Sequence, residues 1–457
     1  MVTSRFAWSN FRMVAMKKLA ILIVMMAAAL LPAAAQDWIR TGTGLGVERI
    51  RIAAPDFKTT STDPKTAPLL QTFNSVFWND LEQAGIFEMV SKSFYPLGSF
   101  GAPADIQLNA WGNPPPNAGM LTFGSFNVGG GYINMQGWLY DVKNPQTPEV
   151  LARQYHETAT DENARIIAHK FADEIIFRLG GGIPGIADSK IFFVRGSNGH
   201  KEIWEMDYDG ANQHAITHLG TISLSPRVSP DGNRLAFSSF LHGGPDILMY
   251  SLLLNRLVRY PRFGGGNLSP AWSPDGNTIA FSSSRTGDPE IYTADADTGL
   301  KLKRLTAYRG PDVSPVWNPK TGVQIAWVSG RTGLPQIYVM DSDGTNVIRM
   351  TDGGYAVSPS WSPNGQFLAF SWIRHYGPGA PGAEDIYIMD VASHQWVQLT
   401  HDGGRNDFPS WSPDGRHIVF QSSRSGSEQI WTMLADGSQQ KQVTFSGVNS
   451  QPFWSAK

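Results

Sequence analysis

Hydrophobic residues in the second half of the chain fall in short runs, separated by stretches rich in glycine, proline and serine. One run has a small residue at its centre and recurs at 235–237, 279–281, 325–327, 368–370 and 418–420. Most copies are followed by a glycine-containing turn and then by a second apolar run of the Ile-Tyr type. Short apolar runs bounded by turn residues are typical of β-strands. The pattern therefore predicts an all-β region of many short strands.

A five-residue motif, Trp-Ser-Pro-Asp-Gly, precedes these runs. It is intact at 272–276 and 411–415, and it has Asn in place of Asp at 361–365. Altered copies lie at 228–232 and 317–319. In a tight turn, proline presets φ at the second position and glycine accepts the left-handed exit. We therefore interpret the motif as a turn between two strands, with its tryptophan as a wedge between neighbouring repeats.

The tryptophan position of this motif recurs with a nearly constant spacing. It falls at positions 228, 272, 317, 361, 411 and 454, in steps of 44, 45, 44, 50 and 43 residues, with Val228 in the first copy. A period of about 40–45 residues, with four short strands in each repeat, is typical of β-propeller blades. The spacing predicts a propeller over residues 185–457.

The number of blades follows from the two ends of the repeat array. No copy of the motif precedes the strands predicted at 191–194 and 203–207, whereas the last copy stops after Trp454 and Ser455. The strand at 451–455 is therefore expected to complete the first blade. Five full repeats and one split repeat predict six blades in a closed ring, which leaves no open sheet edge where the ends meet.

The region before the repeats mixes two hydrophobic periods. Alternating residues predict strands, and residues three or four apart predict helices. Three glycines after residue 179 are a helix-stopping signal. The predicted strands and helices are, in order, strand 49–55, helix 69–84, and strands 85–90, 106–111 and 133–140, then helix 161–179. We predict an α/β domain over residues 36–184, with a flexible mature N-terminus.

The first 35 residues have the pattern of a secretory signal peptide. Two lysines at 17–18 precede an apolar run at 19–31, and small residues follow up to Ala35. A transmembrane anchor needs about 20 apolar residues, and this run is shorter. We predict cleavage after Ala35 and an exported protein that is not inserted into the membrane.

Composition narrows the chemistry. The chain of 457 residues has no cysteine and a net charge of −2, which excludes disulfides and gives no reason to expect a nucleic-acid partner. The aspartate-rich turns at 207–210 and 341–344 lack the spacing of an EF-hand calcium loop. His-Glu-x-x-His, Gly-x-Ser-x-Gly and P-loop motifs are absent from the sequence. We expect no catalytic, cofactor-binding or metal-binding residues, and hence a protein that is not an enzyme.

Polar residues gather in the loops that lead into the tryptophan-bearing strands. Since every blade is entered in the same sense, these loops meet at one mouth of the propeller. A ring of polar side chains around a central channel is a common docking surface for proteins or ligands. The predicted mouth residues are Asn267, Ser269, Asp312, Ser314, Tyr355, Ser358, Asn406, Asp407, Asn449 and Gln451.

This arrangement resembles the TolB family, the periplasmic component of the Tol–Pal envelope system. The resemblance is carried by the leader, by an α/β domain with Ala-His-Lys-Phe-Ala-Asp-Glu at 168–174, and by the six repeats. It covers essentially the whole mature chain. It implies a monomeric, non-enzymatic scaffold in the periplasm that supports outer-membrane integrity and constriction at cell division.

The resemblance also implies two partners. In the family the propeller mouth binds Pal, an outer-membrane lipoprotein that grips peptidoglycan, so the ten mouth residues are expected to bind a Pal-like protein. The mature N-terminal segment binds TolA, a protein anchored in the inner membrane. That contact would fall on Asp37, Trp38, Ile39 and Arg40, and an extended segment can bind by adding a strand to a sheet.

An alternative function comes from the fold alone. Six-bladed propellers also host hydrolases and lyases, and a fold does not decide a function. The channel would then bind a small molecule or a glycan, or carry a dispersed hydrolase or lyase site. A propeller peptidase is disfavoured, because the chain lacks the Gly-x-Ser-x-Gly nucleophile motif.

Overall fold

The computed structural model describes residues 43, 45–46, 48–374, 383–401 and 403–456. The predicted signal peptide with Ala35, and the segment Asp37, Trp38, Ile39 and Arg40, lie outside the described residues. Glu48–Lys457 form one compact unit, which contains both the α/β domain and the propeller. Within the described part of the chain, no helix is long and apolar enough to cross a membrane.

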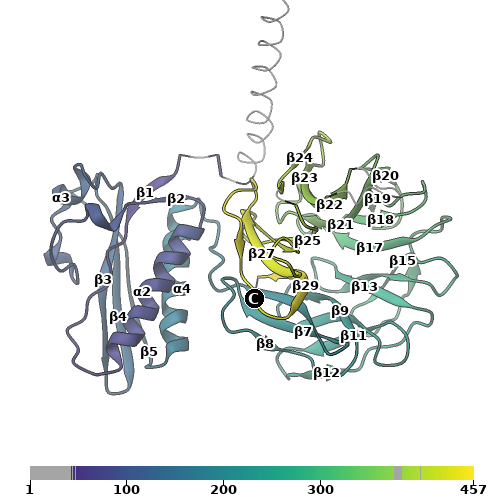
Figure 1. Ribbon diagram of the computed structural model, residues 1–457, viewed down its shortest axis with the longest axis horizontal. Helices are drawn as coiled ribbons and strands as arrows, with labels where there is room; N and C mark the ends of the chain where they lie inside the picture. The colour runs from purple at the N-terminus through teal and green to yellow at the C-terminus, as the bar shows by residue number, and fades with distance from the viewer. Residues whose placement is uncertain (1–42, 44, 47, 375–382, 402, 457) are drawn as a thin grey trace, which may run out of the picture. The chain divides into compact units, whose positions relative to one another are not determined.

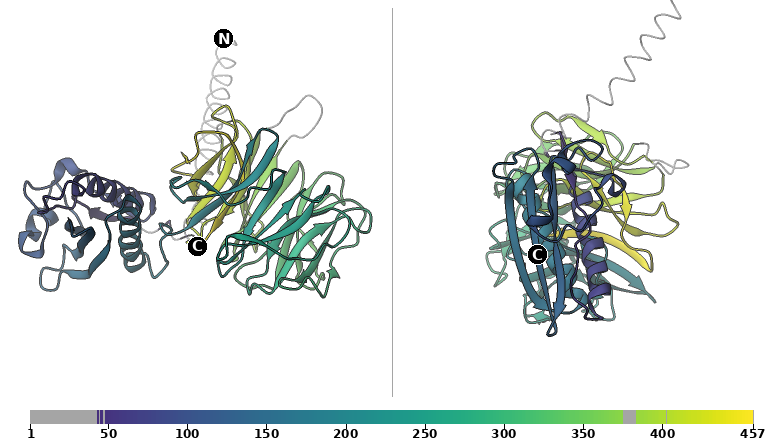
Figure 2. Two further views of the ribbon diagram at one scale, coloured as in Figure 1. Left: turned by 90° about the horizontal axis from the view of Figure 1, so that it is seen from below. Right: turned by 90° about the vertical axis from the view of Figure 1, so that its left-hand side faces the viewer.

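The α/β domain is a five-stranded sheet with the order β2-β1-β3-β4-β5. β1 is parallel to both β2 and β3, and the remaining pairs are antiparallel. The helices α2 and α4 pack against each other on one face of the sheet (Figure 1), and α2, in purple, runs roughly along the long strands in the right-hand view of Figure 2. The elements are β1 (Ile50–Ala53), α2 (Thr66–Gln83), β2 (Phe87–Met89), α3 (Leu108–Gly112), β3 (Met120–Gly129), β4 (Tyr132–Asp141), β5 (Glu149–Thr158) and α4 (Asp161–Leu179), with single 3₁₀ turns at Lys92–Phe94 and Pro103–Asp105.

Helix α4 confirms the helix predicted at 161–179. It begins after Thr160, whose side chain accepts a hydrogen bond from the backbone N–H of Asn163 at 3.1 Å. It ends at Leu179, where Gly180 follows as C-cap. The apolar side of the helix is buried against α2, and Phe171 stacks on Phe77 with 5.3 Å between ring centroids.

The strand predicted at 106–111 is wrong, because this segment is helical. A 3₁₀ turn at Pro103–Asp105 is followed by α3, which buries only Trp111 completely. The alternation of Ile106 and Leu108 produces side chains that are only partly buried. The sheet position beside β1 is taken instead by β3, a strand that the pattern did not predict.

The propeller has six four-stranded sheets, as predicted. The innermost strands surround a common axis (Figure 1). In order from the innermost strand outward, the blades are β29 (Val448–Ser455), β6 (Lys190–Ser197), β7 (His200–Asp207) and β8 (His214–Ala215); β9 (Ser223–Val228), β10 (Arg234–Ser239), β11 (Asp246–Ser251) and β12 (Arg256–Val258); β13 (Asn267–Trp272), β14 (Thr278–Ser283), β15 (Glu290–Asp295) and β16 (Lys303–Arg304); β17 (Asp312–Trp317), β18 (Gln324–Ser329), β19 (Gln336–Asp341) and β20 (Ile348–Arg349); β21 (Tyr355–Trp361), β22 (Phe367–Ile373), β23 (Glu384–Asp390) and β24 (Trp396–Gln398); β25 (Asn406–Trp411), β26 (His417–Ser422), β27 (Gln429–Leu434) and β28 (Lys441–Gln442).

The predicted closure of the ring is confirmed. β29 is the innermost strand of the first blade and pairs antiparallel with β6, with Asn449 opposite Arg195 and Trp454 opposite Ile191. Arg195 adds a side-chain hydrogen bond from Nε to Asn449 Oδ1 at 2.8 Å. The first blade therefore joins both ends of the repeat array.

Buried polar contacts connect the α/β domain to the first blade. Asp80 on α2 is 2% exposed, accepts a hydrogen bond from the hydroxyl of Tyr208 at 2.5 Å and lies 2.8 Å from Nδ1 of His169. Burial disfavours the imidazolium form, but the Asp80 carboxylate outweighs this effect and raises the pKa of His169. Arg165 continues the network with an ion pair to Asp209 at 2.8 Å.

A second contact involves the turn of the last full repeat. His417 Nε2 lies 2.7 Å from the carbonyl oxygen of Gln83, and its Nδ1 lies 3.1 Å from Asp414 Oδ2. Both neighbours are acceptors, so both ring nitrogens must carry hydrogen to satisfy them. Burial opposes the charged ring, but Asp414 and Gln83 raise the pKa of His417 above its usual value.

Candidate binding site in the propeller channel

The direction of the innermost strands defines two ends of the propeller channel. Each innermost strand begins at the end that we call the mouth, and it finishes at the tryptophan position of the repeat. We call the second end the tryptophan end. The hairpin loops between the second and third strands return to the mouth, whereas those between the third and fourth strands lie at the tryptophan end. The predicted mouth residues therefore belong to the first of these two ends.

Each innermost strand contains a bulge before a proline. The pairing with the second strand shifts register at this point in all six blades. The residue before the proline has φ between 49° and 54°, a value that is unusual outside glycine and typical of functional or tightly constrained positions. The six residues are Ser225, Ser269, Ser314, Ser358, Phe408 and Gln451.

The bulges bring together three of the predicted mouth residues. Ser269, Ser314 and Ser358 line a narrow part of the channel with Ser225, around a small cavity of about 40 Å³. Backbone N–H groups at the bulges are bonded to neighbouring blades, as Ser225 N–H is to Gln451 Oε1 at 2.7 Å. These three predicted residues therefore lie in a narrow neck inside the channel.

Four other predicted mouth residues are fully buried. Asn267, Asp312, Asn406 and Asn449 are each 0% exposed. Three of them join blades, because each amide Nδ2 donates to a side-chain oxygen in the preceding blade. The bonds are Asn267 to Asp246 at 3.2 Å, Asn406 to Asp385 at 3.1 Å and Asn449 to Gln429 at 2.8 Å. A partner that docks at the mouth would therefore contact side chains other than these four.

The remaining predicted mouth residues differ in exposure. Asp407 is 6% exposed and accepts a hydrogen bond from the hydroxyl of Ser371 at 2.6 Å. Tyr355, at the start of β21, and Gln451 are partly exposed.

Exposed apolar side chains at the mouth were not predicted. Phe445 is 78% exposed, Tyr308 56% and Val448 47%, and all three lie in or beside loops that lead into innermost strands. The sequence did hold a signal for them. An aromatic residue in a polar, glycine-containing loop, as in Thr-Phe-Ser-Gly at 444–447, has no strand face on which to be buried.

Three of the repeat tryptophans are wedges between blades, as interpreted from the repeat, whereas Trp317 is partly exposed and its indole N–H has no hydrogen-bond partner. Trp272, Trp361 and Trp411 are each under 10% exposed. Each indole N–H donates to a carbonyl oxygen of the preceding blade: Trp272 to Arg227 at 2.9 Å, Trp361 to Val316 at 3.3 Å and Trp411 to Ser360 at 3.2 Å. The tryptophan therefore fixes both the distance between adjacent blades and their relative position along the channel axis.

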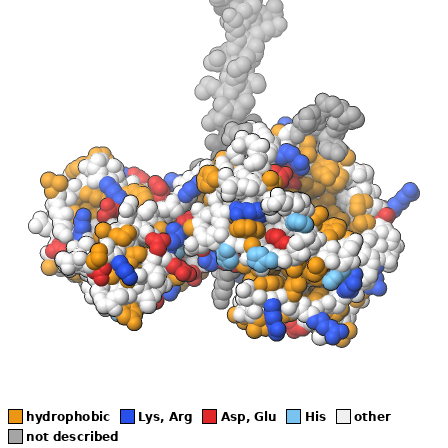
Figure 3. Space-filling view, turned by 60° about the horizontal axis from the view of Figure 1, so that its bottom comes forward, with side chains coloured by type: hydrophobic (Ala, Val, Ile, Leu, Met, Phe, Trp, Pro, Cys, Tyr) orange, Lys and Arg blue, Asp and Glu red, His pale blue; other side chains and the backbone are white. Residues whose placement is uncertain are grey.

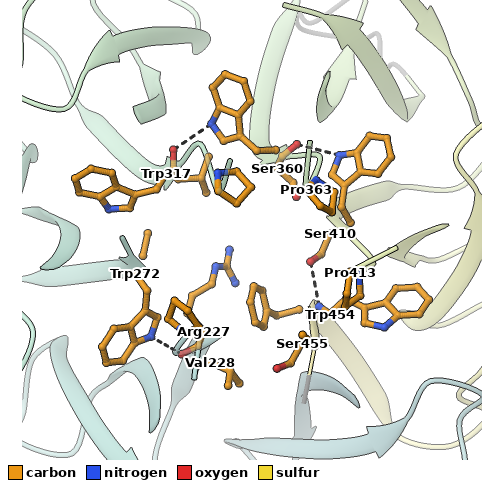
Figure 4. A pocket seen from close by; sticks show the side chains of 18 of the residues that line it. Arg227, Val228, Trp272, Trp317, Ser360, Pro363, Ser410, Pro413, Trp454 and Ser455 are labelled. Atoms are coloured by element: carbon orange, nitrogen blue, oxygen red, sulfur yellow. Dashed lines mark hydrogen bonds between the residues drawn. The ribbon is translucent and has the colours of Figure 1, made fainter. Parts of the chain in front are cut away.

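The tryptophan end encloses a larger cavity of about 330 Å³. Its walls come from the tryptophan strands and from the prolines of the repeat turns, including Pro230, Pro274 and Pro413. Arg227 points toward the centre of this cavity, whereas the indole of Trp272 points away from it (Figure 4). The channel is thus narrow and polar near its neck and wider and apolar beyond it.

We searched the described residues for grouped metal ligands and for large areas of one charge. Among the described residues, no three His, Cys, Asp or Glu side chains are grouped so that they could hold a metal ion. On the face in Figure 3, acidic and basic side chains are interspersed, without a large area of one sign. The candidate sites are the surface at the mouth and the cavity in the channel.

An α/β domain followed by a closed six-bladed propeller, with an apolar cavity on its axis, defines a two-domain propeller protein. Two family models match this chain in the same order. The TolB amino-terminal domain matches residues 43–147, and the TolB beta propeller domain matches residues 178–377 and 353–457. The chain therefore belongs to the TolB family.

Individual relatives agree with this assignment. The chain is 34% identical over 232 residues to the Tol-Pal system protein TolB of Desulfosudis oleivorans, a match that covers 50% of this chain and 51% of the relative. It is 32% identical to the protein of the same name from Bordetella pertussis, over 66% of this chain and 65% of the relative. In these matches the chain spans about half to two thirds of the relatives' length. The crystal structure of TolB from Acinetobacter baumannii superimposes with a TM-score of 0.75 at 25% identity, covering 90% of this chain and 97% of that one.

Proposed function

We propose that the protein is a non-enzymatic periplasmic scaffold of the Tol–Pal system. In this role it binds a Pal-like peptidoglycan-associated lipoprotein of the outer membrane and a TolA-like protein of the inner membrane. The link supports outer-membrane integrity and constriction at cell division. The proposal rests on membership of the TolB family, whose relatives are named Tol-Pal system proteins.

The single observation that supports docking at the mouth is the exposure of Phe445, at 78%. Large aromatic side chains contribute much of the binding free energy in protein interfaces when they enter a pocket of the partner. Val448 is exposed at the start of β29, three residues after Phe445, and Tyr308 is exposed in the loop that leads into β17, three blades further around the ring. Exposed apolar side chains with polar neighbours are typical of surfaces that bind another protein.

The mouth proposal is tested by binding of the soluble domain of a peptidoglycan-associated lipoprotein. Phe445→Asp and Tyr308→Asp are expected to weaken binding at least about tenfold, the effect of losing an interface anchor. Leu253→Asp is the matched control, since Leu253 is 75% exposed but lies in a hairpin loop at the tryptophan end. Equal affinities for all three variants and the unchanged protein would exclude docking at the mouth.

The second partner is tested with the N-terminal segment. We propose that Asp37, Trp38, Ile39 and Arg40 bind the C-terminal domain of a TolA-like protein as an added strand. Removal of residues 36–47 should abolish that binding and leave binding of the lipoprotein unchanged. The scaffold role fails if pull-down from periplasm recovers no such lipoprotein and a deletion strain keeps normal envelope integrity.

A further inference from the structure

One cation stands alone on the axis of the propeller. The residue before the tryptophan position is Ala271, Val316, Ser360, Ser410 or Phe453 in five blades, but it is Arg227 in the remaining blade. The side chain points into the cavity at the tryptophan end, toward the middle of the surrounding ring of residues (Figure 4). Arg227 lies on the innermost strand β9, and the register of that strand directs its side chain into the channel. It therefore differs from an arginine in an exposed loop.

The guanidinium of Arg227 has few partners of its own. Nη1 donates to the carbonyl oxygen of Pro226 at 2.7 Å, and the group lies 5.2 Å from the ring centroid of Phe453. None of the ion pairs found in the described part of the chain includes Arg227. No aspartate or glutamate is among the described residues that line either part of the channel.

This isolation carries an energetic cost. Arg227 is only partly exposed, and a charged group that is partly removed from water without a counter-ion is destabilising. Burial lowers the pKa of Arg227 to about 10, so the group keeps its charge at neutral pH. The same position in the other five blades is occupied by uncharged side chains, so the blade fold itself has no need of a cation here.

We propose that the cavity at the tryptophan end binds a carboxylate-bearing ligand, with Arg227 as its anion-binding residue. A guanidinium binds a carboxylate through two parallel N–H···O bonds. Arg227 is the one charged side chain among the described residues that line the cavity, and one positive charge matches a monoanion, whereas a phosphate dianion would bring a second, uncompensated charge. The Ser410 hydroxyl, at the equivalent position of another blade, accepts a hydrogen bond from the backbone N–H of Trp454 at 3.0 Å.

The walls define the rest of the ligand. Pro230, Pro274, Pro363 and Pro413 present an apolar lining, so an aromatic or aliphatic body would face them. A volume of about 330 Å³ lies at the lower end of the range for small-molecule sites. It fits a small organic acid or the C-terminal residue of a peptide, two sources of the same carboxylate.

Calorimetric titration of the purified protein with benzoate tests the proposal, and benzamide serves as the neutral probe of the same shape. Saturable binding of benzoate that is at least about tenfold tighter than that of benzamide is expected, as for a charge-assisted hydrogen bond. Arg227→Ala, which introduces the residue found at the equivalent position 271, should remove the preference for benzoate. The matched control is Arg256→Ala, an exposed arginine on β12, which should leave it unchanged.

A free tripeptide acid and its C-terminal amide separate the two sources. If the peptide acid binds more tightly than benzoate and the amide does not bind, the ligand is a chain terminus; if benzoate binds and neither peptide does, it is a free organic acid. Benzamide binding as tightly as benzoate to the unchanged protein would overturn the proposal, and this comparison does not depend on the folding of any variant. Full retention of benzoate binding by a folded Arg227→Ala would also overturn it.

Discussion

The indole Nε1 of Trp411 donates a hydrogen bond to the carbonyl oxygen of Ser360 at 3.2 Å, across a blade boundary and 51 positions of sequence. The ring is 5% exposed and stacks on Phe367 with 6.3 Å between centroids. One side chain therefore couples the end of its own innermost strand to the end of the neighbouring one. The same relationship holds between Trp361 and Val316.

Replacement of this wedge should destabilise the propeller strongly. Trp411→Ala removes a buried ring and is expected to lower the free energy of unfolding by about 3–5 kcal/mol. Trp411→Phe keeps most of the packing and loses the hydrogen bond, so a smaller loss is expected, with about 1 kcal/mol from the bond itself. Denaturant unfolding measures both. Stability near that of the unchanged protein for Trp411→Ala would show that the ring is not a structural wedge.

The contact of His417 with Asp414 and Gln83 should depend on pH. Because the folded pKa of His417 is raised above the usual value of 6.5, its contribution to stability is fully present below pH 6.5. It is lost as the pH rises through the folded pKa. Free energies of unfolding for the unchanged protein and for His417→Gln, measured between about pH 5.5 and 8.5, should therefore converge toward high pH. A difference that grows with pH would contradict the protonated imidazole.

The buried pair of Asp80 and His169 should show strong coupling. His169→Ala leaves a carboxylate without its nearest cation in a closed environment, and such a loss costs about 3–5 kcal/mol. Asp80→Ala combined with His169→Ala should cost clearly less than the sum of the two single replacements. A double-mutant cycle, with unfolding free energies as readout, measures the coupling. Additive effects would mean that the two side chains do not stabilise each other.

Two glycines on β3 provide a test of packing in the α/β domain. A Cβ atom at Gly124 would overlap the carbonyl oxygen of Gln136 and the ring of Phe57, whereas a Cβ at Gly129 meets nothing within 4 Å. Gly124→Ala is expected to lower the unfolding free energy by about 1–3 kcal/mol or more, as overpacking does. Gly129→Ala should change it by less than about 0.5 kcal/mol. Thermal unfolding distinguishes the two, and equal melting temperatures would argue against the close approach.

The propeller could be predicted because its signals are local and repeated. In the turn at 272–276, the Ser273 hydroxyl and the Asp275 carboxylate bond to each other, and the N–H of Gly276 bonds to the Ser273 carbonyl at 2.9 Å. Such a turn forms from neighbouring residues alone, so its sequence fixes it wherever it occurs. The closure of the ring by β29 could be predicted because the count of these turns showed that the last repeat is incomplete.

The binding site was harder to predict because it depends on contacts between blades. Asn267 and Asn449 looked like loop residues, but each is the buried partner of a side chain in the preceding blade. The role of Arg227 depends on what surrounds it, and the surrounding residues come from all six blades. The segment 106–111 failed for a related reason, since the place beside β1 is taken by β3, a strand more distant in the sequence.

The pairing of β29 with β6 also sets an order of events during synthesis. Arg195 and Asn449, which bond across this pair, are 254 positions apart, so β6 leaves the ribosome long before its partner. Domains that form as the chain emerges fold from the N-terminus onward, and contacts between distant positions form late. The first blade to be made is thus the last to be finished. Until then β6 presents a free strand edge, which can pair with a strand of another chain.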